Sequence, residues 1–280
     1  GLCVMALGTD TMGSVRIPAA YCGVAGLKPS RGLIATQGVI ALSTTLDHVG
    51  PLTRSARDLP AFVSALSGRP ERVTRGLTGL TIGRWRFEGQ VQADREVVDA
   101  FERACAQLDQ AGAKLVDVTA QAYAYGRTRR LGLLISEIEG HAIHAERLRE
   151  DPAGFSDPFR ALLEWGAGQP AEKARAAYDD VKAVERDAAR WFDGVDLVIA
   201  PTALEPAFAF GADIPASQAD LTAFADMAGV PAAAVPMGLT RTGRPVSLQF
   251  IASKGADDLA MTAARQFEAL MGGPFIPPGY

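Results

Sequence analysis

The regular pattern between residues 77 and 118 limits the possible folds more than any other part of the chain. A short apolar segment at 80–82 is followed by a helical stripe, a glycine stop at Gly112 and a second apolar segment at 115–118. The stripe consists of Val97, Val98, Phe101, Ala104, Cys105 and Leu108. Strand, helix and strand in this order predict a β-α-β unit, which requires a sheet covered by helices.

The remaining segments extend this pattern to most of the chain. Residues 120–195 are predicted to be mostly helical, and strands are predicted at 197–200, 232–236 and 246–251, with a last helix from Asp257. Residues 1–75 are rich in glycine and small residues and predict tight turns, short strands and helix ends. We therefore expect an α/β/α sandwich with a large mixed sheet. Residues 1–280 are taken as a single domain with a helical insertion at about 120–195.

Composition and charge exclude several classes of protein. With 48% hydrophobic residues, 29 glycines and 17 prolines, the chain has the composition of an ordinary globular protein. Its net charge of -4 gives no basic field for a phosphate backbone, so no nucleic-acid partner is expected. The uncharged stretches 32–46 and 227–240 are shorter than the roughly 18 to 20 apolar residues of a membrane span, so no membrane partner is expected.

Cysteine usage and the start of the chain indicate where such a protein works. Cys3, Cys22 and Cys105 are scattered and lack C-x-x-C spacing, which predicts neither disulfides nor a thiolate zinc site and favours a reducing cytoplasm. The chain opens at Gly1 in an apolar stretch without a basic region, which is neither a signal peptide nor a natural start. We therefore expect further sequence upstream.

The strongest local signal is the segment 8–19, GTDTMGSVRIPA. It lacks the lysine of a phosphate-binding G-x-x-x-x-G-K-[ST] loop, and Arg16 stands where a G-x-S-x-G elbow needs its second glycine. What remains is Ser14 after Gly13, in a turn whose consecutive backbone N–H groups could point at one oxygen, as an oxyanion hole requires. The alternative is a loop hydroxyl bonded to nearby backbone.

Two other groups of residues suggest chemistry more weakly. Asp47 and His48 could complete a Ser-His-Asp triad with Ser14, but adjacent residues point in different directions. His141 and His144 lie one helical turn apart, yet no third metal ligand follows a recognised pattern, so a solvated helix face is expected and no metal. The arginines at 127–130 are expected on the surface as well.

Several segments taken together resemble a known family. They are GTDTMGSVRIPAAYCGVAGLKPSRG at 8–32, ALSTTLDHVGPLTRSARD at 41–58, DLVIAPTALEPA at 196–207 and AGVPAAAVPMGLTRTGRPVSLQFIA at 228–252. These runs resemble, in order, the G-T-D-T-G-G-S-I-R-x-P-A, C-G-V-x-G-L-K-P-T, S-x-D-x-x-G-P-x-x-R and closing-strand segments of the amidase signature family. The chain is identified as a member on this resemblance.

The resemblance implies a serine amidohydrolase fold and a mechanism without cofactor. Ser14 would be the nucleophile, activated by a second serine after a cis peptide bond and by a neutral lysine acting as base. Both partners belong to segments upstream of Gly1. Lys28 does not replace that lysine, because it matches the G-L-K-P segment that follows the nucleophile.

The resemblance also assigns the loop around Ser14. The oxyanion donors would be the backbone N–H groups of Thr11, Met12, Gly13 and Ser14. We interpret Asp10 and Arg16, which flank the nucleophile, as residues that hold the loop through hydrogen bonds and charge; the alternative is direct contact with substrate, with Arg16 as an anchor for an acidic one. Met12 stands where the family has glycine. If the turn needs a positive φ there, this side chain costs roughly 1 to 2 kcal/mol.

Three functions follow as hypotheses. The first is an amide hydrolase that acts on a small-molecule carboxamide through a serine acyl-enzyme, with a homodimer as the expected assembly. The second is a protein similar to the A subunit of an amidotransferase, which would need partner subunits. The third is a truncated, non-catalytic family member that serves as a binding module, which the missing base and Met12 favour.

Overall fold

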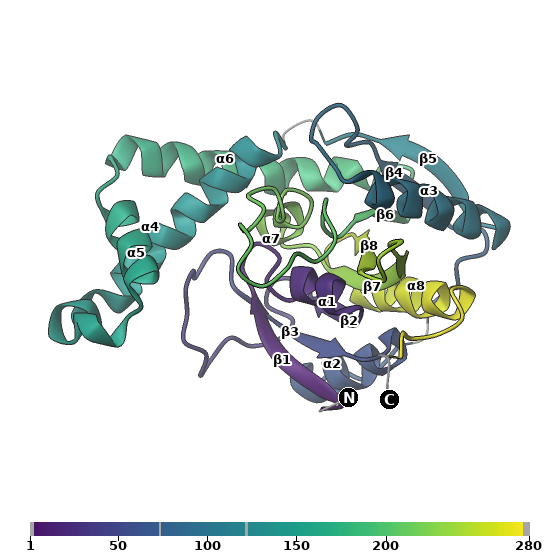
Figure 1. Ribbon diagram of the computed structural model, residues 1–280, viewed down its shortest axis with the longest axis horizontal. Coiled ribbons are helices and arrows are strands. Elements are labelled where there is room, and N and C mark those ends of the chain that lie inside the picture. The colour runs from purple at the N-terminus through teal and green to yellow at the C-terminus, as the bar shows by residue number, and fades with distance from the viewer. Residues whose placement is uncertain (1–2, 73, 121–122, 277–280) are drawn as a thin grey trace.

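A single eight-stranded sheet organises the fold (Figure 1). The computed structural model describes residues 3–72, 74–120 and 123–276. The strand order is β1-β3-β2-β7-β8-β6-β4-β5, and β4 is parallel to β5 and β6 whereas the other neighbours are antiparallel. The strands are β1 (Met5–Asp10), β2 (Ala25–Lys28), β3 (His48–Thr53), β4 (Thr81–Trp85), β5 (Lys114–Val118), β6 (Leu197–Pro201), β7 (Ala232–Leu239) and β8 (Pro245–Ala252).

The predicted β-α-β unit is confirmed by β4, α3 (Arg95–Gln110) and β5. The Asp94 carboxylate caps α3 by accepting the N–H of Glu96 at 2.7 Å, and the predicted stripe is buried along the helix except for Val98, which is half-buried. The two strands lie side by side with Ile82 opposite Leu115. The segments expected at 80–82, 115–118, 197–200 and 246–251 all belong to the one sheet.

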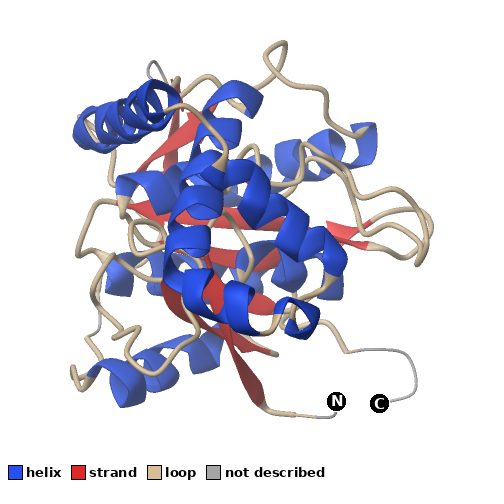
Figure 2. Cartoon of the chain, turned by 90° about the vertical axis from the view of Figure 1, so that its left-hand side faces the viewer, coloured by secondary structure: helices blue, strands red, loops and turns tan. Residues whose placement is uncertain are grey.

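Helices cover both faces of the sheet, which confirms the expected sandwich. Successive side chains of a strand point to opposite faces. On β8, the Gln249 side chain meets Arg16 of α1 (Arg16–Cys22), whereas the next residue, Phe250, packs against Phe267 of α8 (Asp257–Leu270) with ring centroids 5.7 Å apart. Helices α1 and α8 therefore lie on opposite sides, and Figure 2 shows the strands enclosed between helices.

Three helices between β5 and β6 form the stretch expected to be helical. They are α4 (Gly126–Glu150), α5 (Asp157–Ala167) and α6 (Ala171–Trp191), with the short 3₁₀ turn η2 (Pro152–Gly154) before α5. In Figure 1 they extend to the left of the sheet, with α5 at the far end. Within the described ranges, no helix combines the length and the apolar character needed to cross a bilayer.

The N-terminal quarter holds more regular structure than its composition predicts. It contributes β1, β2 and β3, helices α1 and α2 (Leu59–Ser67), and the 3₁₀ turn η1 (Ala56–Asp58). Strand β1 is an edge strand that pairs only with β3, in a register that sets Asp10 opposite His48. Much of β1 faces solvent, including Leu7 with 54% of its surface exposed.

Candidate functional site

The segment that joins β1 to α1 presents Ser14 at the surface. Ser14 is exposed, whereas its neighbours Gly13 and Val15 are buried. Gly13 has φ = 132°, and a Cβ placed on it would lie 2.3 Å from the Oγ1 of Thr222. Both the backbone conformation and the close approach require glycine immediately before the serine.

Asp10 holds this loop from inside. One carboxylate oxygen accepts the N–H of Gly13 at 2.6 Å, and the other accepts the N–H of Val15 at 3.3 Å and the Nε–H of Arg16 at 3.0 Å. Burial alone would raise the pKa of Asp10, but the adjacent Arg16 guanidinium and its hydrogen bonds hold that pKa well below the ordinary value. Asp10 is therefore an anion that fixes the backbone on both sides of Ser14.

Arg16 connects the loop to distant parts of the chain. Its fully buried guanidinium reaches Asp226 Oδ2 at 2.6 Å and Gln249 Oε1 at 3.1 Å, in addition to Asp10. Asp226 lies on α7 (Ala223–Ala228), a six-residue helix that is buried on every side. The loop is thus anchored to β8 and to α7.

Met12 does not carry the strain considered from the sequence. Outside glycine, Tyr125 alone has a positive φ in the described part of the chain, so the left-handed position of this turn is Gly13. The Met12 carbonyl accepts a hydrogen bond from Thr222 Oγ1 at 2.7 Å. The Met12 side chain is buried against α4, since a Cβ on Gly132 would lie 2.7 Å from its Cε.

Not all of the backbone N–H groups that were expected to bind an oxyanion are free to do so. The N–H of Gly13 is engaged by Asp10. The N–H groups of Thr11, Met12 and Ser14 have no hydrogen-bond partner within the described residues.

His48 meets Asp226 rather than Ser14, which removes the basis for a Ser-His-Asp triad. Its buried ring donates from Nδ1 to the carbonyl of Leu46 at 2.7 Å, and the same nitrogen lies 3.4 Å from Asp226 Oδ1. Burial, followed by the nearby charge of Lys28, lowers the pKa of His48 well below its ordinary value. His48 is therefore a neutral part of the buried polar cluster.

Lys28 belongs to the same cluster. It is fully buried and donates from Nζ to the carbonyl of Pro29 at 2.7 Å. Burial lowers its pKa to about 7; the carboxylates of Asp226, Asp10 and Asp257 oppose this shift, and Arg16 adds to it.

Stability should consequently depend on pH through Lys28. The unfolded chain, with a lysine pKa near 10.5, binds this proton more strongly than the folded protein, so the free energy of unfolding rises as pH increases from about 7. We expect the difference between wild type and Lys28→Met to change by up to about 1.4 kcal/mol per pH unit between pH 7 and 9. Urea titrations at several pH values measure it, and parallel curves for the two proteins would contradict it.

Other residues considered from the sequence have structural partners. His144 Nε2 lies 2.8 Å from the carbonyl of Ala41, and the described residues contain no group of three or more side chains able to hold a metal ion. The arginines at 127–130 are not simply a solvated face, because Arg129 pairs with Asp220 at 2.5 Å and Arg130 with Glu137 at 3.0 Å. Within the described residues, no side chain is hydrogen-bonded to Ser14.

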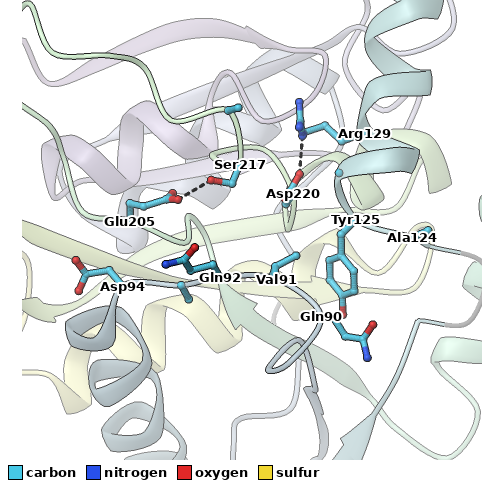
Figure 3. Close-up of a pocket in the computed structure, with 13 residues that line it drawn as sticks. Gln90, Val91, Gln92, Asp94, Ala124, Tyr125, Arg129, Glu205, Ser217 and Asp220 are labelled. Atoms are coloured by element: carbon cyan, nitrogen blue, oxygen red, sulfur yellow. Dashed lines mark hydrogen bonds and ion pairs between the residues drawn. The ribbon is translucent and has the colours of Figure 1, made fainter.

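A large pocket of about 770 Å³ opens beside the start of α4 (Figure 3). It is lined by the segments 90–94, 124–126 and 216–217 together with Arg129, Glu205 and Asp220. Asp220 lies two residues before Thr222, which holds the Met12 carbonyl. The pocket therefore borders the segment that supports the candidate loop, although Ser14 itself does not line it.

Sequence reasoning missed three residues that hold the loop, and it considered Asp47 only in another connection. Thr222, Asp226 and Gln249 reach it from more than 200 residues away, and Asp47 accepts a hydrogen bond from Thr11 Oγ1 at 2.7 Å. Asp226 and Gln249 stand in apolar segments, where a polar residue needs a partner. That requirement is the one sequence signal that singles them out.

Comparisons with known proteins identify relatives of this chain. The Amidase family matches residues 1–261. The A subunit of glutamyl-tRNA(Gln) amidotransferase from Exiguobacterium sibiricum is 32% identical over 99% of this chain and 66% of its own length, and its counterpart from Synechococcus sp. (strain CC9902) is 30% identical over 96% and 63%.

Solved structures give the same result. A crystal structure of an amidase superposes with a TM-score of 0.86 and 30% identity, covering 95% of this chain and 62% of that one. The A subunit of glutamyl-tRNA(Gln) amidotransferase from Thermotoga maritima gives a TM-score of 0.78 and 27% identity, covering 95% and 62%. The chain spans 61% to 66% of the length of curated relatives of this kind. With its sheet order, its Ser14 loop and these matches taken together, the chain belongs to the amidase signature family.

Proposed function

We propose that the protein is an amide hydrolase that works through an acyl-enzyme on Ser14. The observation that carries this proposal is the exposed Ser14 in a loop that Asp10 and Arg16 fix from the buried side. Its chemistry would begin with attack of Ser14 Oγ on a carboxamide carbon. The carbon–nitrogen bond then breaks, the nitrogen leaves with a proton as ammonia or an amine, and water releases the acid.

The oxyanion of the addition step needs hydrogen-bond donors. The unpaired N–H groups of Thr11, Met12 and Ser14 are the candidates, with Gly13 excluded because its N–H already donates to Asp10. The proton of Ser14 needs a base, and the family resemblance assigns it to a lysine and a second serine of the segment before the Ser14 loop. Lys28 does not take this role, because it lies in the buried cluster with its amine on the Pro29 carbonyl.

Trapping with hydroxylamine tests the acyl-enzyme. An acyl-serine partitions between water and hydroxylamine, so a catalytically active form should release ammonia from a simple carboxamide and form the hydroxamate at the expense of the acid. Ser14→Ala should lose both products together. Ammonia release at an unchanged rate with no hydroxamate would contradict the acyl-enzyme.

An amidotransferase role is the second candidate, because the similar curated relatives are amidotransferase subunits. It uses the same acyl chemistry but passes ammonia to a partner. Affinity purification from the source cell distinguishes the two: stable copurification with further subunits favours the amidotransferase, whereas a lone protein or homodimer that hydrolyses small amides favours the hydrolase. For the hydrolase we propose a small-molecule substrate, the homodimer as its assembly and the cytoplasm as its location.

A further inference from the structure

The segment 41–47 lies along α4, on the side of the candidate loop. His144 Nε2 meets the carbonyl of Ala41 at 2.8 Å. One turn earlier in α4, the absence of a side chain at Gly140 lets Leu42 approach, since a Cβ there would lie 2.9 Å from Leu42 Cδ1. The helix therefore supports this segment along more than one turn.

Glu139 makes the strongest of these contacts. Its Oε2 accepts from Ser43 Oγ at 2.5 Å and from the N–H of Thr45 at 3.1 Å. Its Oε1 accepts from Thr45 Oγ1 at 2.5 Å and from the hydroxyl of Tyr178, on α6, at 2.8 Å. Burial alone would raise the pKa of Glu139, but the hydrogen bonds from Ser43 and Thr45 lower it overall, so the acceptor is a carboxylate.

Asp47 connects the same segment to the candidate loop. Its Oδ2 accepts the N–H groups of Leu42 and Ser43 at 2.8 and 2.9 Å, and its Oδ1 accepts Thr11 Oγ1 at 2.7 Å. Thr11 is the first residue after β1 and contributes one of the unpaired N–H groups. The position of Thr11 thus depends on the conformation of the segment that Glu139 holds.

We propose that Glu139 is a positioning residue for the loop 11–14, acting through Ser43 and Thr45 on Asp47 and from there on Thr11. The inference rests on the proposed function only where it concerns catalysis. Its physical basis is a continuous chain of hydrogen bonds to two carboxylates, and such bonds are roughly twice as strong as bonds between neutral groups. A small shift of an oxyanion donor is costly to an enzyme, because these donors act only when they are correctly placed.

Amide hydrogen exchange tests the structural part without any need for activity. Glu139→Gln retains the size of the side chain but leaves one oxygen acceptor for four donors. We expect exchange to become about tenfold faster at Thr45, Leu46 and Gly13, whose N–H groups donate to Glu139, Ser43 Oγ and Asp10. The exposed Glu146 on the same helix has no side-chain partner within the described residues, so Glu146→Gln is the matched control and should match wild type.

The same exchange measurement shows whether Glu139 acts through Asp47. If it does, Asp47→Asn and the double variant with Glu139→Gln should give nearly equal exchange at Gly13, because the effect of Glu139 on the loop passes through Asp47. Additive effects, or wild-type exchange at Gly13 in Glu139→Gln, would overturn the inference. Should Glu139→Gln not fold, Thr45→Val removes one donor to Glu139 and should give the same pattern, about fivefold faster.

Kinetics separate positioning from plain stabilisation. In a form that turns over an amide, Glu139→Gln should lower kcat about tenfold or more and leave KM within about twofold, because the substrate still binds but the donors are displaced. An unchanged kcat would limit Glu139 to a structural role. Wild-type amide exchange in Glu139→Gln would refute the inference itself. An active Ser14→Ala variant would instead refute the proposed function, and the exchange result would remain valid.

Discussion

A preparation of the 280-residue chain alone is expected to resist labelling by a fluorophosphonate probe. Within the described residues Ser14 has no hydrogen-bonded base, so its hydroxyl should react as an ordinary alcohol. General-base assistance is typically worth about 10²- to 10⁴-fold, and removal of one member of a catalytic unit often costs nearly as much as removal of all. Intact-mass measurement after a timed exposure to the probe should therefore find almost no adduct.

A longer form supplies the contrast. When the chain is extended upstream by a segment that carries the lysine and second serine of the family pattern, we expect one adduct per molecule, located at Ser14. Ser14→Ala in this form should remove both the adduct and amide turnover. Stoichiometric labelling of the short chain, or labelling of the extended Ser14→Ala variant, would show that the nucleophile or its activation has been misassigned.

Of the substitutions proposed for this protein, Arg16→Met should lower the free energy of unfolding the most. The guanidinium is fully buried and joins two fully buried carboxylates, Asp10 at 3.0 Å and Asp226 at 2.6 Å. Removal of one partner from a buried ion pair leaves an uncompensated charge and costs about 3 to 5 kcal/mol. Urea unfolding followed by circular dichroism measures this loss as a lower midpoint.

The matched control is Arg95→Met. The Arg95 side chain is 90% exposed and lies 3.7 Å from Asp99, so its loss should change the midpoint little. If Arg16→Met and Arg95→Met unfold at the same urea concentration, the buried cluster does not stabilise the fold. Asp226→Asn in the Arg16→Met background should recover part of the loss, because burial and the neighbouring Asp10 already raise the pKa of Asp226 and disfavour its charged form once Arg16 is gone.

The parts of the fold that could be predicted are those where local pattern and tertiary environment agree. The stripe of α3 has the spacing of a one-sided helix, and its flanking strands carry apolar residues that pack in or against the core, namely Ile82 in β4 and Leu115 and Val118 in β5. Helix α7 gives no such pattern, since all six residues are buried. In β1 the exposed faces remove the alternation by which a strand is recognised, so neither element can be predicted from local pattern.

The site divides in the same way. The resemblance in segment 8–19 draws attention to Asp10, Ser14 and Arg16 because they are close in sequence. Asp226 and Gln249 escape it, since contacts across 210 and 233 residues leave no trace in local spacing. The local sequence also does not show that Arg16 contacts two carboxylates, because the second one, Asp226, lies on α7 and meets Arg16 only in the folded chain.

The edge position of β1 gives Arg16 a second consequence, which concerns strand register. An edge strand with exposed faces has little side-chain packing to choose between alternative pairings with its neighbour. A slip of two residues against β3 would preserve the alternation of faces but move Asp10 and the attached loop by roughly 7 Å. Arg16 could not then reach Asp226 and Gln249, which are fixed to α7 and β8. The contacts of buried Arg16 with Asp226 and Gln249 therefore favour the one register of β1 against β3 that places Ser14 in its observed position.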